Sequence, residues 1–171
     1  MRKVLCTTLL AAGVASGDLL EISVDGVADT SYGDFAGSLF LDTDTGALTG
    51  DISLPAVQTP SGAYPGTVTF DGLYSGVATS GETSQGSVTG PQYVGDAFMS
   101  FPFLGGFDLG FDVVFGDGLS LGDSGLGVTY LSGNSPFGPL EATLSFNYSV
   151  VPAPGAIALL GLAGLGRRRR S

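Results

Sequence analysis

The side chains that could do chemistry in this 171-residue chain are almost all carboxylates and phenols. It contains sixteen Asp and Glu residues, six Tyr residues, no His, and one cysteine, Cys6. No Lys, Arg or His lies between Val4 and Gly166. Triads, thiol chemistry, imidazole metal sites and cationic oxyanion stabilisers are therefore excluded there, and a carboxylate pair, as in glycosidases, is the catalytic device left. Spacing alone nominates no such pair, so we expect a protein that is not an enzyme.

One short motif could bind a cation. Asp42-Thr-Asp44-Thr-Gly46 resembles the start of a calcium loop. Its glycine comes one residue early, and the twelfth position from Asp42 is Ser53 rather than a bidentate Glu. Two interpretations remain open. One is a calcium site on Asp42 and Asp44, and the other is a hairpin turn whose Asp side chains cap backbone amides. No other cofactor is expected.

Aromatic side chains could stack on sugars. A carbohydrate-binding module would use exposed tyrosines, and the absence of Trp argues against it. The candidate stacking residues are Tyr32, Tyr64, Tyr74, Tyr93 and Tyr130.

The charge distribution restricts the partners. All six cationic residues lie at the ends of the chain, so a body trimmed at both ends would carry about sixteen negative charges. Nucleic acid, anionic lipid headgroups and phosphate ligands are expected to be poor partners, because their recognition depends on Lys and Arg. Divalent cations are natural partners for such a surface. The alternative is that the acidic surface only keeps a secreted protein soluble.

The elements that must position these side chains are strands. Apolar runs at 37–42 and 47–54 flank a polar turn that ends in Gly46, which predicts a hairpin with a positive φ at this glycine. Strict alternation from Leu140 to Val150 predicts a strand with one buried face. Asp18–Val24, 67–71 and 126–131 also read as strands, and 75–90 as a mobile loop or a pair of weak edge strands.

Phenylalanine marks the expected core. Six of the eleven phenylalanines lie between Phe98 and Phe115, where apolar residues alternate with Asp108, Gly110 and Asp112. This alternation predicts rings that face inward, and each buried ring contributes about 1.5 to 3 kcal/mol.

The pattern of short strands and glycine-rich turns, with no internal helix, predicts an all-β domain over 18–150. We expect an antiparallel β-sandwich of the jelly-roll type with eight to ten strands. The alternative is a closed barrel of the outer-membrane type. It is disfavoured because such barrels need long strands with an outward apolar band and aromatic girdles.

The N-terminus has the features of an export signal. Arg2 and Lys3 are followed by an apolar run to Ala15 and by small residues that would allow cleavage after Ser16 or Gly17. Residues 1–17 are therefore predicted to be a signal peptide handled by the Sec export machinery. Its removal would take Cys6 with it and leave a body without cysteine.

The C-terminus, residues 151–171, consists of a proline turn, an apolar run and an arginine block. The turn is Pro152-Ala153-Pro154-Gly155, the run continues to Gly166, and the block is Arg167, Arg168, Arg169 and Arg170. As a helix, the twelve residues from Gly155 to Gly166 would extend about 18 Å, which is short of a hydrocarbon core of about 30 Å. The arginines would stay on the cytoplasmic side. A buried or amphipathic terminal helix is the alternative, although a run that is apolar on every face has no solvent side.

This order of features resembles the PEP-CTERM sorting signal, with Ala153 at the place of the glutamate in the motif. The resemblance covers only this tail. It implies processing by an exosortase-type protease, transient inner-membrane anchoring, and a final place at the cell surface or in the medium. It also implies a role in an extracellular polysaccharide or biofilm matrix. We therefore expect a noncatalytic exported protein, with a carbohydrate-binding module as the alternative and a carboxylate-based glycosidase after it.

Overall fold

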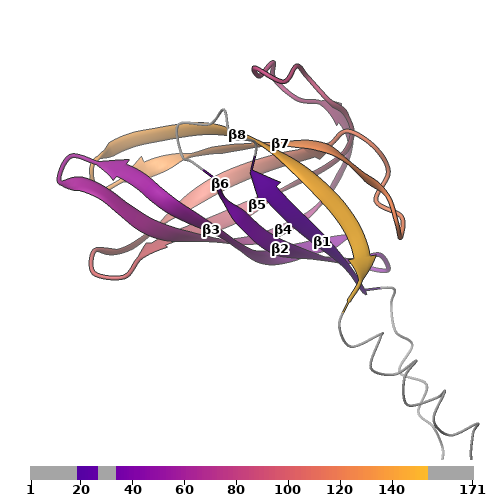
Figure 1. The fold of residues 1–171 in the computed structure, drawn as a ribbon, viewed down its shortest axis with the longest axis horizontal. Coiled ribbons are helices and arrows are strands. Elements are labelled where there is room, and N and C mark those ends of the chain that lie inside the picture. The colour runs from indigo at the N-terminus through magenta and orange to yellow at the C-terminus, as the bar shows by residue number, and fades with distance from the viewer. Residues whose placement is uncertain (1–18, 27–33, 154–171) are drawn as a thin grey trace, which may run out of the picture.

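The chain forms one closed antiparallel sheet. The structure is a computed structural model and describes residues 19–26 and 34–153 (Figure 1). Its strands are β1 (Leu19–Gly26), β2 (Ala36–Asp42), β3 (Ala47–Thr59), β4 (Gly62–Thr79), β5 (Thr89–Phe101), β6 (Gly105–Phe115), β7 (Ser124–Ser135) and β8 (Gly138–Pro152). The all-β prediction is confirmed.

The predicted two-sheet jelly roll is replaced by an eight-stranded barrel. Each strand pairs with the next in the sequence, and β1 pairs with β8 from Leu20 opposite Pro152 to Gly26 opposite Phe146. A jelly roll would require connections that cross between two sheets. Here every connection between described strands joins neighbours, so the sheet curls until its edges meet.

Alternation along the strands separates an apolar interior from a polar exterior. The predicted strand from Leu140 to Val150 lies in β8, where Ala142, Leu144, Phe146, Tyr148 and Val150 are buried. In the buried core, the Phe115 ring lies 5.8 Å from Phe146 and 5.1 Å from Tyr148, edge to face. Such pairs stabilise by about 0.5 to 1.5 kcal/mol each beyond the area they bury.

The prediction that the rings between Phe98 and Phe115 face inward is correct only in part. Phe101, Phe111 and Phe115 are buried, whereas Phe98 is 45% exposed and Phe103 is 93% exposed. Phe98 lies at an outward position of β5, and Phe103 lies in the turn between β5 and β6. The prediction from alternation is therefore correct for Phe111 and Phe115 in β6 and wrong for Phe98 and Phe103.

The hairpin predicted around Gly46 is confirmed as β2 and β3. Gly46 has a φ of 72° and donates its backbone N–H to the Asp42 carbonyl at 2.8 Å. This left-handed conformation strains any residue with a Cβ, so glycine is needed there.

Strands β4 and β5 continue past the barrel wall as a two-stranded extension. We call residues 76–90 the arm; it projects at the upper right of Figure 1. Pairing resumes at Gly76 opposite Gln92 after a bulge that follows Tyr74. Val88 of the arm packs against Val114 and Val128 on the outside of β6 and β7, so this part of the arm contacts the barrel wall. The sequence predicted a loop or weak edge strands here.

The predicted signal peptide, residues 1–17, and the tail beyond Ala153 lie outside the described residues, and so does the predicted C-terminal helix. In the part of the chain that the structure does describe, no helix is long and apolar enough to cross a membrane.

Candidate functional site

Three depressions on the barrel could receive a ligand. We call them the outer groove, on the wall formed by β2 to β5; the mouth pocket, at the end of the barrel opposite the described termini; and the arm cleft, between the arm and the wall. Their volumes are about 510, 260 and 230 Å³ respectively.

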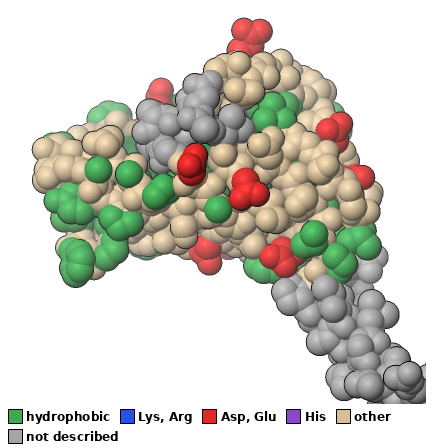
Figure 2. All heavy atoms as spheres, viewed as in Figure 1, with side chains coloured by type: hydrophobic (Ala, Val, Ile, Leu, Met, Phe, Trp, Pro, Cys, Tyr) green, Lys and Arg blue, Asp and Glu red, His purple; other side chains and the backbone are tan. Residues whose placement is uncertain are grey.

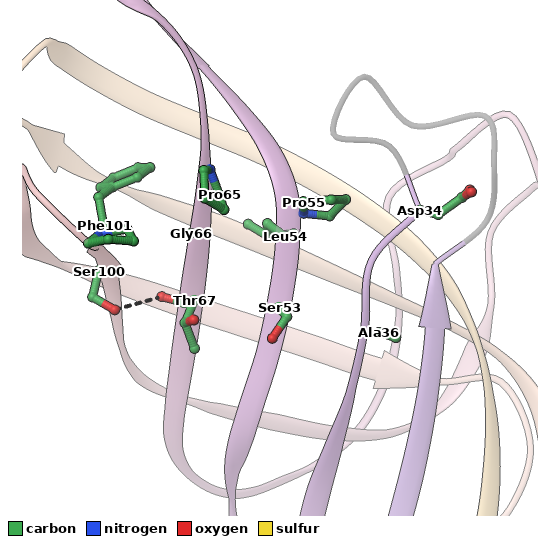
Figure 3. A pocket seen from close by; sticks show the side chains of 11 residues that line it. Asp34, Ala36, Ser53, Leu54, Pro55, Pro65, Gly66, Thr67, Ser100 and Phe101 are labelled. Carbon is green, nitrogen blue, oxygen red and sulfur yellow. Dashed lines mark hydrogen bonds between the residues drawn. The ribbon is translucent and has the colours of Figure 1, made fainter.

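The outer groove is lined by small hydroxyl side chains and prolines (Figure 3). Ser53, Thr67 and Ser100 are direct cross-strand partners, and the Ser100 Oγ donates to the Thr67 carbonyl at 3.4 Å. Beside this row, β3 and β4 lose register between Leu54 and Val57. The groove runs to Asp34, the first described residue after 27–33.

The mouth pocket is aromatic. Phe101 and Phe107 line it with ring centroids 6.2 Å apart, together with Phe137 from the turn between β7 and β8. Apolar side chains gather at this end of the molecule, on the left in Figure 2. Phe103 and Leu104 are exposed beside it.

The arm cleft combines an aromatic ring, apolar side chains, hydroxyls and carboxylates. Its wall is a row of direct cross-strand partners on β6, β7 and β8, namely Asp112, Tyr130 and Thr143. Val114 and Val128 supply an apolar base, and the arm closes the other side. The arm contributes Thr79, Ser80, Gly81 and Glu82.

Carboxylates dominate the electrostatics of the cleft. Asp112 is half-buried, and its Oδ2 accepts a hydrogen bond from Gln92 Nε2 at 2.7 Å. Burial, followed by the charge and hydrogen bond of Glu141, raises the pKa of the Tyr130 phenol. Fourteen of the sixteen carboxylates lie among the described residues, all except Asp18 and Asp29, and those residues contain no Lys, Arg or His.

The five candidate stacking tyrosines lie in different environments. Tyr130 is 40% exposed in the arm cleft, and Tyr74 is 51% exposed at the base of the arm. Tyr64 is half-buried against the core. Tyr93 is buried inside the barrel, where burial and then the nearby Tyr74 raise its pKa to about 12. Tyr32 lies outside the described residues, so Tyr130 is the predicted tyrosine that the structure places in a depression.

Asp42 and Asp44 lie in the turn between β2 and β3. The Asp42 Oδ1 accepts hydrogen bonds from the backbone N–H groups of Asp44 at 2.9 Å and Thr45 at 3.2 Å. Hydrogen bonds from Thr45, and then from the Asp44 amide, lower the pKa of Asp42. This is the amide-capping arrangement. No group of three or more His, Cys, Asp or Glu side chains that could hold a metal occurs in residues 19–26 and 34–153.

The described part of the tail motif belongs to the barrel. Pro152 is the last residue of β8 and pairs with Leu20, and Ala153 is 4% exposed. The other residues predicted to form the sorting signal, Pro154, Gly155 and Arg167 to Arg170, lie outside the described residues.

Sequence reasoning missed the residues that surround Tyr130. Asp112, Thr143 and Glu82 are far apart in the chain and meet only through strand pairing and arm docking. An outward position in a strand is readable from alternation, but the partner strand is not. Comparison of the chain with protein-family models, curated proteins and solved structures finds no match.

Proposed function

We propose that this chain is an exported, noncatalytic protein that its C-terminal tail sorts to the cell surface or the medium, where it contributes to an extracellular polysaccharide matrix. Export would use the Sec machinery, and an exosortase-type protease would process the tail. The inner membrane would hold the protein only until that step.

The observation that carries this proposal is that both described ends leave the barrel together. Leu20 of β1 lies opposite Pro152 of β8, and Glu21 lies opposite Val151 (Figure 1, lower right). The predicted signal peptide ends immediately before β1, and the apolar run of the tail begins immediately after β8. Two membrane-directed segments attached at one end of a barrel can enter the same membrane with the barrel on one side of it.

Intact-mass measurement of the exported protein tests the proposal. The expected species lacks residues 1–17 and the block Arg167 to Arg170. A matched variant that replaces the four arginines by Gln keeps the apolar run but loses its cytoplasmic anchor, and it should be processed poorly. An exported wild-type protein that retains the arginine block would contradict tail processing.

Carbohydrate binding is the second candidate, favoured by the setting of Tyr130. Its ring lies in a cleft beside a carboxylate and hydroxyls, the groups that orient polar ligands in binding sites. Binding of the exported protein to a panel of polysaccharides should be lost in Tyr130→Ala. It should persist in Tyr74→Ala, which removes an exposed tyrosine outside the cleft.

A further inference from the structure

We propose that the arm cleft binds a sugar unit carrying a free amino group within a polysaccharide, with Tyr130 beneath the sugar ring and Asp112 and Glu82 facing the ammonium. This inference rests on the carbohydrate-binding function proposed above and names the ligand class of that site.

The shape of the cleft suits one ring of a polymer. Its volume of about 230 Å³ is below the ~300–1,000 Å³ of sites for drug-sized ligands. Tyr130 offers an aromatic surface to the C–H face of a sugar, while Val114 and Val128 extend the apolar contact. Thr143 and Thr79 place hydroxyl groups on opposite sides, because one comes from β8 and the other from the arm.

The charges of the cleft favour an amine over other substituents. Two carboxylates line it, Asp112 from β6 and Glu82 from the arm. A cation near an aromatic ring and carboxylates gains both cation–π and Coulomb energy. A uronic acid polymer would be repelled, because the described residues hold no cationic side chain that could offset these carboxylates.

The half-burial of Asp112 concentrates this preference at the cleft. Its hydrogen bond to Gln92 Nε2 holds the carboxylate in place and uses one of its two oxygens. A charge that is partly shielded from water is screened less by salt than the exposed carboxylates elsewhere on the barrel.

The test is a titration of the exported protein with three oligosaccharides of equal length and linkage: glucosamine, N-acetylglucosamine and glucose oligomers. The amine-bearing oligomer should bind about tenfold more tightly than its N-acetylated form. Tyr130→Ala should abolish this binding, whereas Tyr74→Ala should leave it unchanged. Equal affinities for the amine-bearing and N-acetylated oligomers would overturn the ligand class while leaving carbohydrate binding by Tyr130 intact.

A charge-matched pair of double variants separates the cleft from the general acidity of the barrel. Asp112→Asn with Glu82→Gln removes two carboxylates from the cleft, and Asp51→Asn with Asp71→Asn removes two from the opposite part of the wall. The first double variant should lose the preference for the glucosamine oligomer over its N-acetylated form, and the second should retain this preference. Equal losses in both would mean diffuse attraction and would overturn the site.

If the wild-type protein binds none of the three oligomers, both the inference and the carbohydrate-binding candidate fail, whereas tail processing is judged by mass alone.

Discussion

At the scale of single residues, the turn at Asp42 has a pH-dependent role. Its carboxylate holds two backbone amides, and this hydrogen bonding lowers its pKa from the ordinary value of 3.8. A carboxyl with a lowered folded-state pKa stabilises the fold above its unfolded pKa, and the effect is lost as pH falls through the folded value.

We therefore expect Asp42→Ala to lower the Tm at pH 7 and to lower it much less at pH 2. Thermal unfolding followed by circular dichroism measures both differences. Asp44→Ala removes a charge from the same turn and serves as the control. A Tm difference for Asp42→Ala that does not shrink in acid would contradict capping as the role of this carboxylate.

The same turn decides the calcium question. Because one Asp42 oxygen is already engaged by amides, we expect the wild-type Tm to be equal in chelator and in millimolar calcium. A calcium-dependent rise in Tm that Asp42→Ala abolishes would restore the metal site.

Asp71 and Asp51 lie on the same outer face, but one is next to a like charge and the other is next to a hydrogen-bond donor. Asp71 is directly opposite Asp96, whereas the Asp51 Oδ1 accepts a hydrogen bond of 2.6 Å from Thr69 Oγ1. Like charges opposite one another destabilise a sheet by about 0.2 to 1 kcal/mol. Asp71→Asn should therefore raise the free energy of unfolding by about that amount.

Asp51→Asn should instead lower the free energy of unfolding, by about 0.5 to 1.5 kcal/mol, because it weakens a cross-strand hydrogen bond. Each change removes one negative charge, so a general effect of net charge would move both in the same direction. Urea unfolding of the two variants separates these possibilities, and stabilisation by both would sink the local explanation.

At the scale of elements, strand positions were predictable and strand partners were not. Gly46 and the polar turn before it predicted the β2–β3 hairpin because a hairpin is a local structure. The alternation in β8 predicted which of its residues face the core. Closure of the sheet depends on the pairing of Leu20 with Pro152, more than 100 residues apart, and no local pattern encodes this contact.

The sequence predicted the arm only as a mobile loop or a pair of weak edge strands, because its small side chains carry little pattern. Its position depends on a close backbone approach as well as on the packing of Val88 against Val114 and Val128. A Cβ at Gly90 would clash with the Phe115 carbonyl oxygen, so only glycine permits this contact. The arm cleft therefore depends on a residue that has no side chain.

Gly90→Ala should lift the arm from the wall and expose Val114 and Val128. We expect a loss of about 1 to 3 kcal/mol in the free energy of unfolding, the usual cost of overpacking. Hydrogen exchange should speed up in residues 76–90. Gly81→Ala is the control, because a Cβ there meets no atom within 4 Å. Equal exchange in the two variants would show that the arm does not depend on this contact.

At the scale of the whole molecule, the barrel has an acidic exterior, and its first and last strands, β1 and β8, place the two described ends side by side. The exterior allows the charge preference proposed for the arm cleft, and the adjacent ends allow the membrane tethering proposed for the tail. Both depend on closure by β1 and β8. If closure brings the ends together, the order of the chain around the barrel should matter little to its stability.

We expect a circular permutant to retain the fold. Joining Ala153 to Leu19 by about four Gly and Ser residues spans ends that lie on paired strands, where opposite Cα atoms are about 4.5 to 5.5 Å apart. New ends between Gln85 and Gly86 would open only the exposed tip of the arm. The Tm should stay within a few degrees of that of the unpermuted barrel, because loop lengths change stability slowly.

A second permutant with new ends at Ala97, inside β5 and buried, should fail to fold, because it breaks the wall where β4, β5 and β6 pair. Cooperative unfolding of the second permutant but not of the first would contradict closure through the β1–β8 pairing.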